Sequence, residues 1–358
     1  MHSEKEETHP KNDPNEKSSI VSIKYGDDKL EILDQALEES GFWKCLEEKF
    51  EISGKEKKDF EIAVKPNFMV LTAAEDLSNY TDTEMVVHLL KRFYDLGYRK
   101  LYVVESENVL GQWYGNRSVD AVAKAAGYKD DFYRISSLTR NAEPYHYRGI
   151  LKEHFVGCVW KDADFRISFA KNKTHPAGTY TLTLKNIFGT TVYQNKYLDY
   201  HKHLEWDKCI IDMLDSFPVD FGIVDGYISS DGPFGFRGAK RPKLTKTVIA
   251  GANLIAVDWV GALKMGINPM RSRLMRKVVA KWGTPAYKVL GPTDIYKKWR
   301  KPPFFLPPFD DILEEWYAAH SFFTHCIMLP PDPEFPEPHA WFFKFIRAIL
   351  FLHYPKKK

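Results

Sequence analysis

The sequence predicts an α/β fold built mainly from parallel βαβ units, because short apolar runs alternate with helical repeats along the chain. The apolar run 60–64 ends in polar residues and precedes a helical repeat at 85–96, and a second apolar run follows at 101–104. Strand, helix and strand with polar strand ends form a βαβ unit. We therefore expect one α/β body, with two lobes around a cleft into which the strand-end loops converge.

Capping residues and periodicity define the individual elements. Thr81 and Asp82 fit a helix N-cap, with Glu84 in the first turn and Gly97 as the stop. The same reasoning predicts one or two helices in 29–50 and further helices at 118–127, 207–217 and 254–265. Strands are predicted at 165–170, 180–184, 221–224 and 248–250.

Composition limits the classes of protein to be considered. The 358 residues are 44% hydrophobic, which is enough for a substantial core, and a formal charge of +3 gives no reason to expect nucleic-acid binding. Cys45, Cys158, Cys209 and Cys326 form no CxxC pair, so we expect a reducing compartment and no iron–sulfur cluster. No apolar run reaches the roughly 20 residues of a membrane span, and the N-terminus lacks the apolar core of a signal peptide. A cytoplasmic protein is predicted.

Polarity divides the chain into three parts. Residues 1–17 are polar and predict a disordered tail, and 18–294 form the α/β domain. Residues 295–358 are a proline-rich linker and a helix rich in aromatic residues, followed by three lysines. This helix, within 339–358, either docks on the protein's own core or on a second subunit, or lies at a membrane surface. In the latter case the protein would be peripheral to the inner membrane surface. The sequence leaves the oligomeric state open.

Candidate functional residues are densest in the segment 163–205. Lys171, Lys173 and His175 follow the predicted strand 165–170. Two lysines and a histidine within five residues create a positive field that suits a phosphate or a carboxylate. The alternative is a solvated loop with scattered charge.

Lys185 and Asn186 follow the run 180–184, whose period of two indicates a half-buried strand. If Lys185 is partly buried at the strand end, its pKa falls and its neutral amine becomes a nucleophile. A salt bridge to a nearby carboxylate is the alternative. Asn186 is a candidate for binding substrate.

His201 and His203 are candidate ligands for a divalent metal such as nickel, zinc or iron. In a strand the two imidazoles would share a face, whereas on a helix they would diverge by roughly 200° and only one would serve the site. Structural packing is the alternative for each.

Polar residues at other strand ends extend this list. Lys65 and Asn67 follow the first apolar strand and would position substrate. Asp225 and Asp231 are expected in a glycine-rich loop after a later strand. They are candidate acid–base or metal-coordinating groups, and the alternative is a tight surface loop without a functional role. This loop matches neither the dinucleotide fingerprint nor a P-loop. Asp258, on a predicted apolar helix, is expected to be a buried hydrogen-bond acceptor or to orient a neighbouring group.

Several blocks together resemble the domain-of-unknown-function family DUF362, over roughly residues 60–270. The blocks are VKPNF at 64–68, TDTEMVVHLLKRFYDLGY at 81–98, KNKTH at 171–175, TLKNIFG at 183–189, YHKH at 200–203, VDGYISSDGPFG at 224–235 and LIAVD at 254–258. Many members add a ferredoxin-like module with cysteine motifs. No such motif is present here.

A more distant similarity, to the nickel-pincer lactate racemases, comes from spacing. His175, Lys185 and His201 are 10 and 16 residues apart, as in that family. The resemblance implies that His175 transfers protons, that Lys185 tethers the cofactor or acts as nucleophile, and that His201 ligates the metal. In the racemases the lysine lies in a glycine-rich motif, whereas here it follows TLTL. The racemase loop that supplies a further histidine corresponds here to residues 105–107, which contain no histidine. The resemblance therefore does not extend to lactate as substrate.

We therefore expect an enzyme that acts on a polar or anionic small molecule by His/Lys acid–base or metal- or cofactor-assisted chemistry. The predicted catalytic residues are His175, Lys185, Asp225 and Asp231, the substrate-binding residues are Lys65, Asn67, Lys171, Lys173 and Asn186, and the metal ligands are His201 and His203. The alternatives are a non-catalytic module that binds an anion, a phosphate ligand or a redox partner, and a protein that contacts a membrane surface through 339–358.

Overall fold

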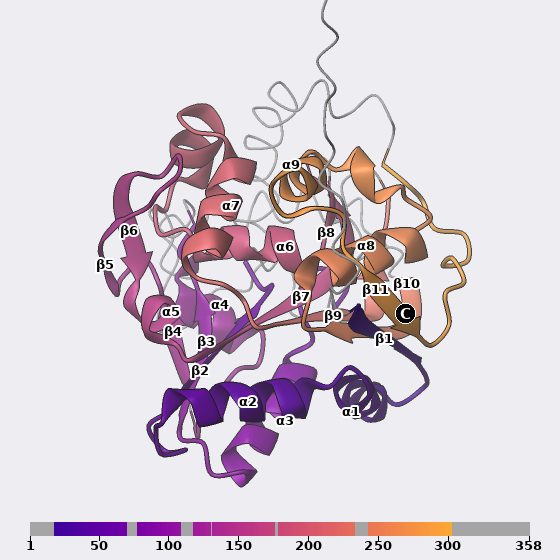
Figure 1. Cartoon of the computed structure of the whole chain (residues 1–358), viewed down its shortest axis with the longest axis horizontal. Helices are drawn as coiled ribbons and strands as arrows, with labels where there is room; N and C mark the ends of the chain where they lie inside the picture. The colour runs from indigo at the N-terminus through magenta and orange to yellow at the C-terminus, as the bar shows by residue number, and fades with distance from the viewer. Residues whose placement is uncertain are drawn as a thin grey trace, which may run out of the picture.

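The computed structural model shows one mixed sheet with helices on both faces (Figure 1). It describes residues 18–69, 77–108, 117–129, 131–175, 178–232 and 243–302. The strands of the sheet are β1 (Ser19–Tyr25), β2 (Glu61–Pro66), β3 (Lys100–Glu105), β4 (Arg134–Ser137), β7 (Phe165–His175), β8 (Thr179–Thr181), β9 (Phe221–Ser230), β10 (Lys243–Gly251) and β11 (Tyr287–Leu290). A separate antiparallel pair is formed by β5 (Ala142–His146) and β6 (Glu153–Gly157).

The strand order is β11-β1-β10-β9-β7-β2-β3-β4, and β8 pairs antiparallel with the end of β7. The five neighbours β9, β7, β2, β3 and β4 run parallel, so their carboxyl ends meet at one edge. On the other side of β9, β10 runs antiparallel to it, and β1 and β11 follow, both in the direction of β9. This arrangement confirms the predicted α/β class. One sheet runs through the domain, from β11 at one edge to β4 at the other.

Helices cover both faces of this sheet. They are α1 (Lys29–Glu39), α2 (Phe42–Ser53), α3 (Thr83–Asp95), α4 (Val119–Ala125), α5 (Cys158–Asp162), α6 (Thr183–Asn186), α7 (Trp206–Ser216), α8 (Leu254–Lys264) and α9 (Arg273–Trp282). Figure 1 shows α1, α2 and α3 on one face and α6 to α9 on the other. On the first face, the ring of Phe42 contacts Phe93, Phe165 and Phe221 with centroids 4.8–5.9 Å apart. Such aromatic contacts join two helices to two strands in one core.

The predicted caps are confirmed. The Asp82 carboxylate accepts from the Glu84 backbone N–H at 3.0 Å at the start of α3. Asn253, which was not predicted as a cap, caps α8 in the same way. The range 29–50 forms two helices, α1 and α2, as one of the two predicted alternatives has it. These local signals work because each cap satisfies backbone donors that the first helical turn leaves open.

Three predicted element boundaries near the candidate residues are wrong, and the strand predicted at 248–250 begins earlier, at Lys243. β7 continues to His175, so Lys171, Lys173 and His175 lie in a strand and not in a loop after it. β9 continues to Ser230, which places Asp225 inside a strand. The strand predicted at 180–184 ends at Thr181, and Lys185 lies on the one-turn helix α6. The physical reason is a buried carboxylate on α8 that binds the backbone N–H groups of the first turn of α6.

The ends of the chain are described only in part. The tail predicted at 1–17 and the helix predicted within 339–358 lie outside the described residues. The described residues 295–302 pack against the sheet domain through Tyr296 and Trp299, while the domain boundary at residue 294 stays a prediction. Within the described ranges, no helix is both long enough and apolar enough to cross a membrane.

Candidate functional site

Two buried ion pairs lie at the carboxyl edge of the parallel strands. Lys171 Nζ is 2.7 Å from Asp225 Oδ2, and neither side chain is exposed to solvent. The same carboxylate accepts the backbone N–H groups of Asp82 at 2.8 Å and Tyr227 at 3.0 Å. This pair therefore joins β7 to β9 and to the start of α3. These contacts stabilise the fold. The roles predicted for Lys171 in substrate binding and for Asp225 in catalysis stay predictions.

The second pair joins β2 to β3. Lys65 Nζ is 2.8 Å from Glu105 Oε2 and also donates to the carbonyl of Pro66 at 2.6 Å. Burial lowers the pKa of Lys65, and the charge of Glu105 opposes this shift. Gly189 lies directly over the pair, since a Cβ there would be 2.5 Å from Lys65 Cε and 2.6 Å from Glu105 Oε1. A glycine at this position lets the chain between α6 and α7 approach the strand ends.

Asn186 connects α6 to the same strands. Its Nδ2 donates to the carbonyl of Lys65 at 2.7 Å and to Ser168 Oγ at 3.2 Å. Its Oδ1 accepts from Asn67 Nδ2 at 3.4 Å. Both asparagines predicted to bind substrate are thus adjacent, and their described contacts orient the strand ends.

Asp258 of α8 holds α6 in place. Its Oδ1 accepts from the backbone N–H and the hydroxyl of Thr183 at 2.7 and 2.5 Å, and its Oδ2 accepts from the backbone N–H of Leu184 at 3.0 Å. Burial raises the pKa of this carboxyl to about 7, although the three hydrogen bonds oppose the shift. The expectation of a buried acceptor is confirmed, and the group that it orients is the turn that carries Lys185.

Lys185 and His201 share two aromatic neighbours. Lys185 Nζ lies 5.3 Å from the Trp206 ring centroid and 5.7 Å from that of Phe188. The imidazole of His201 stacks on Trp206 at 5.8 Å and meets Phe188 edge-on at 5.4 Å. The ammonium group therefore faces aromatic rings that favour a cation. Trp206 and Phe188 were not among the predicted site residues.

His175 lies near both Lys185 and His201. Burial lowers its pKa well below the usual range, and the positive charges of Lys185 and Lys173 and the ring of His201 lower it further. The backbone N–H of Gly178 donates to Nδ1 of His175 at 3.1 Å. Because a backbone N–H can only donate, Nδ1 carries no proton, and the neutral ring holds its proton on Nε2. The structure thus brings together the three residues whose spacing was singled out in the sequence.

A π-helix, Tyr197–Lys202, determines which of the two later histidines faces this cluster. The backbone N–H of His203 donates to the carbonyl of Leu198 at 3.2 Å, the i to i+5 bond of a π-turn. His201 packs against the aromatic rings, whereas His203 is exposed. The divergence expected for a helical segment is therefore found, and the two imidazoles do not share a face. π-turns often occur at functional sites.

Lys196, which precedes the π-helix, is a candidate that the sequence did not single out. Its Nζ donates to the backbone carbonyl and, at 3.0 Å, to the hydroxyl of Thr191. It lies 5.6 Å from the ring centroid of Phe188 and 5.8 Å from that of Tyr200. Burial lowers the pKa of Lys196 to about 7, with Glu105 opposing the shift. The sequence signal would have been a lysine within an aromatic run, YQNKYLDYHKH.

The remaining predicted residues lie in β7 and at the end of β9. Lys173 Nζ donates to the carbonyl of Asn79 at 2.9 Å. Asp231 accepts from the backbone N–H and from Nε of Arg300, each at 2.9 Å, and Lys243 Nζ is 3.6 Å away. The described contacts of Asp231 therefore attach the segment 295–302 to the sheet. Its predicted catalytic role stays a prediction.

The described side chains near His175 and His201 do not form a complete set of metal ligands by themselves. Among the residues that the structure describes, no group of three His, Cys, Asp or Glu side chains is placed to hold a metal ion. His175 and His201 are near each other, and His203 is exposed on another side of its helix. The metal-ligand roles predicted for His201 and His203 stay predictions.

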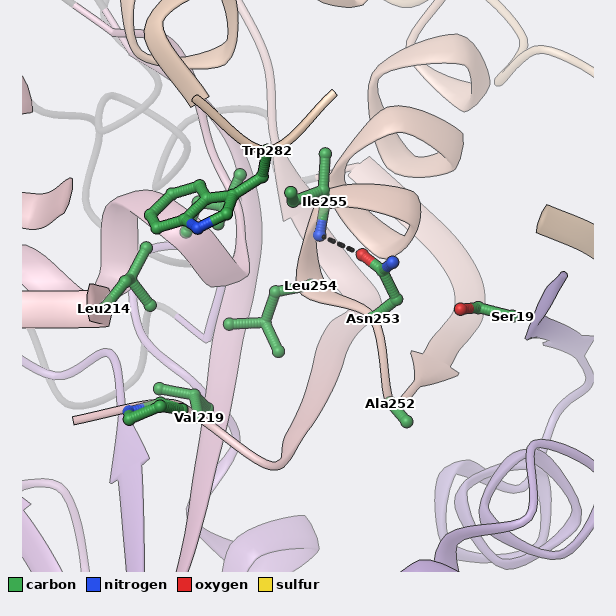
Figure 2. Close-up of a pocket in the computed structure, with 10 residues that line it drawn as sticks. Ser19, Leu214, Val219, Ala252, Asn253, Leu254, Ile255 and Trp282 are labelled. Atoms are coloured by element: carbon green, nitrogen blue, oxygen red, sulfur yellow. Dashed lines mark hydrogen bonds between the residues drawn. The ribbon is translucent and has the colours of Figure 1, made fainter. Parts of the chain in front are cut away.

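An apolar cavity of about 350 Å³ lies apart from this cluster, among α7, α8 and α9 (Figure 2). Its lining is mostly aliphatic and includes Leu214, Val219, Leu254, Ile255 and Trp282. None of the predicted site residues lines it. Its link to the site is Leu184, the residue before Lys185 on α6.

Comparison with known protein families matches residues 62–263, more than half of the chain, to the family described as Domain of unknown function (DUF362). A search of curated proteins found no match. The matched range contains the ion pairs, α6 and the π-helix, while the similarity to lactate racemases is not confirmed. The chain belongs to the DUF362 family.

Proposed function

We propose that the protein is an enzyme that binds a small anion, carrying a carboxylate or a phosphate, beside His175 and Lys185. In this proposal, His175 donates its Nε2 proton in a hydrogen bond to an oxygen on which negative charge develops during the reaction. The observation that carries the proposal is the position of His175, whose Nδ1 accepts the Gly178 N–H, near Lys185 and Lys173 at the carboxyl edge of a parallel sheet. Ligands of open α/β sheets bind at this edge.

The charges around His175 support binding of an anion. The ammonium groups of Lys185 and Lys173 both disfavour a positive charge on the imidazole, so the potential at the ring is positive. A carboxylate or phosphate placed there gains energy from the same field. Its binding would in turn raise the pKa of His175, because a negative neighbour favours the imidazolium.

The tautomer of His175 supports its role as a donor. Nδ1 accepts the N–H of Gly178, so the proton of the neutral ring is on Nε2, and this is the proton that the proposal assigns to the ligand oxygen. A neutral imidazole can donate to an oxyanion without losing its own proton. Donors fixed in advance stabilise developing charge without reorganisation during the reaction. Asp258, by fixing α6, positions Lys185 for the same anion.

Calorimetric titration of the full chain with inorganic phosphate and with acetate tests the proposal. We expect saturable binding of at least one anion, weakened roughly 10-fold in Lys185→Met, because a charge-assisted hydrogen bond contributes about 1.5–3 kcal/mol. Lys208→Met is the matched control, since Lys208 is a surface lysine paired with Glu205, and it should bind as the wild type does. Absence of saturable binding of both anions by the wild type would contradict the proposal.

A further inference from the structure

We infer that Lys196 is a second functional lysine of this site, whose Nζ forms an imine with a carbonyl carbon of the bound ligand. The ligand class is therefore an anion that also carries an aldehyde or a ketone. The inference rests on the proposed anion site, because the cations near His175 would hold the charged end of the same molecule.

The position of Lys196 relative to Phe188 is the first support. The ammonium groups of Lys185 and Lys196 each lie within 5.7 Å of the centroid of this one ring. His201 contacts the same ring edge-on. Phe188 is therefore a neighbour that both amines and the imidazole share, and in this inference the ligand lies beside that ring.

The π-helix is the second support. Because its backbone bonds run from residue i to i+5, residues five apart lie on the same side of the helix, and this spacing includes Lys196, the N-cap residue. Lys196 and His201 have this spacing, and both contact Phe188. In an α-helix, residues five apart would point about 140° away from each other. The rare helix type thus places the amine and the imidazole on one side.

The partners of Lys196, which is partly exposed, distinguish it from the buried lysines of the two ion pairs. Lys65 and Lys171 each face a carboxylate at 2.7–2.8 Å, which favours the ammonium form. The oxygens to which Lys196 donates, both of Thr191, are uncharged. With a pKa of about 7, roughly half of its amines are neutral at pH 7, against about one in 2,500 for an ordinary lysine. Only the neutral amine attacks a carbonyl.

The step is balanced without an oxidant or a metal. The Nζ lone pair forms a bond to the carbonyl carbon, and the oxygen takes up both amine hydrogens and leaves as water. Loss of water from the intermediate requires a proton donor at the oxygen. The side chains of Glu105, Glu107 and Asp199 are close enough to shift the pKa of Lys196, and burial raises the pKa of Glu107, which favours its protonated form.

The test uses glyoxylate, an anionic aldehyde, with borohydride to reduce any imine to a stable amine. The full chain is treated at pH 7, and the adduct is located by peptide mass spectrometry. We expect labelling at Lys196 at least about 10-fold above any other lysine, as its neutral fraction predicts. Lys196→Arg keeps the positive charge and should abolish this adduct, while Lys208→Met should leave it unchanged. Unselective labelling, or an adduct on Lys185 that persists in Lys196→Arg, would overturn the inference.

Acetate, which is not reduced or trapped under these conditions, separates this inference from the proposed function. If acetate binds the same preparation and glyoxylate leaves no adduct on Lys196, the imine is wrong and the anion site stands. If neither acetate nor phosphate binds and no adduct forms, both are wrong. A circular dichroism spectrum of Lys196→Arg identical to that of the wild type confirms that a lost adduct does not reflect misfolding.

Discussion

Replacing Lys171 with methionine lowers the free energy of unfolding by about 3–5 kcal/mol, the cost of leaving one member of a buried ion pair without its partner. Lys171 Nζ is 2.7 Å from Asp225 Oδ2, and both side chains are fully buried. Methionine has a similar length and fills most of the space, so the loss comes from the uncompensated carboxylate and not from a cavity. Urea denaturation followed by circular dichroism measures the change.

Two further variants separate charge from packing at this position. Lys171→Met combined with Asp225→Asn removes both charges and should recover part of the lost stability, because the remaining amide is neutral. Lys208→Met removes an exposed lysine of a surface pair and should change stability by less than about 1 kcal/mol. A Lys171→Met variant as stable as this control would show that the buried ion pair does not stabilise the fold.

Replacing Asp258 with alanine lowers the free energy of unfolding by about 2–4 kcal/mol and weakens anion binding as well. The carboxylate accepts three hydrogen bonds from Thr183 and Leu184, and each buried donor left open costs about 1–3 kcal/mol, partly relieved by relaxation. Loss of these bonds releases α6, which carries Lys185. Unfolding and calorimetry on the same variant measure both effects. Lower stability with unchanged anion binding would show that α6 does not need this support.

Asp258 also makes stability depend on pH. Its pKa is raised from 3.8 in the unfolded chain to about 7 in the folded protein, so the folded state retains a proton that the unfolded state releases. The contribution of this group to the free energy of unfolding therefore falls as the pH rises from about 4 to about 7. Asp258→Asn does not titrate and should show a smaller decrease over this range. An equal pH dependence in both proteins would contradict the raised pKa.

Local signals predicted the βαβ core of the fold. Asp82 marks the start of a helix because capping depends on a few adjacent residues, and the apolar runs of β2, β3 and β9 are long enough to identify. β4 and β5 were not predicted. Arg134–Ser137 and Ala142–His146 are short and partly polar, so neither run shows a clear strand pattern by itself. β4 pairs with β3, and β5 pairs with the following strand β6.

The site was predicted in position but not in detail. The spacing of His175, Lys185 and His201 identified three residues that the structure brings together through a sheet strand, a one-turn helix and a π-helix. Lys196 was missed because its low pKa arises from burial and from distant residues. The partner of Lys171 was also not predicted, since only the register of β7 against β9 places it beside Asp225.

Nitrogen NMR of the histidine side chains as a function of pH tests the central claim most directly. With phosphate absent, His175 should remain the neutral Nε2–H tautomer to a pH well below 6.5, and Lys185→Met should raise its midpoint by removing one positive charge. Saturating phosphate should raise the midpoint in the wild type. A His175 ring that titrates near 6.5 in every sample, insensitive to phosphate and to Lys185, would contradict a neutral imidazole in a cationic site.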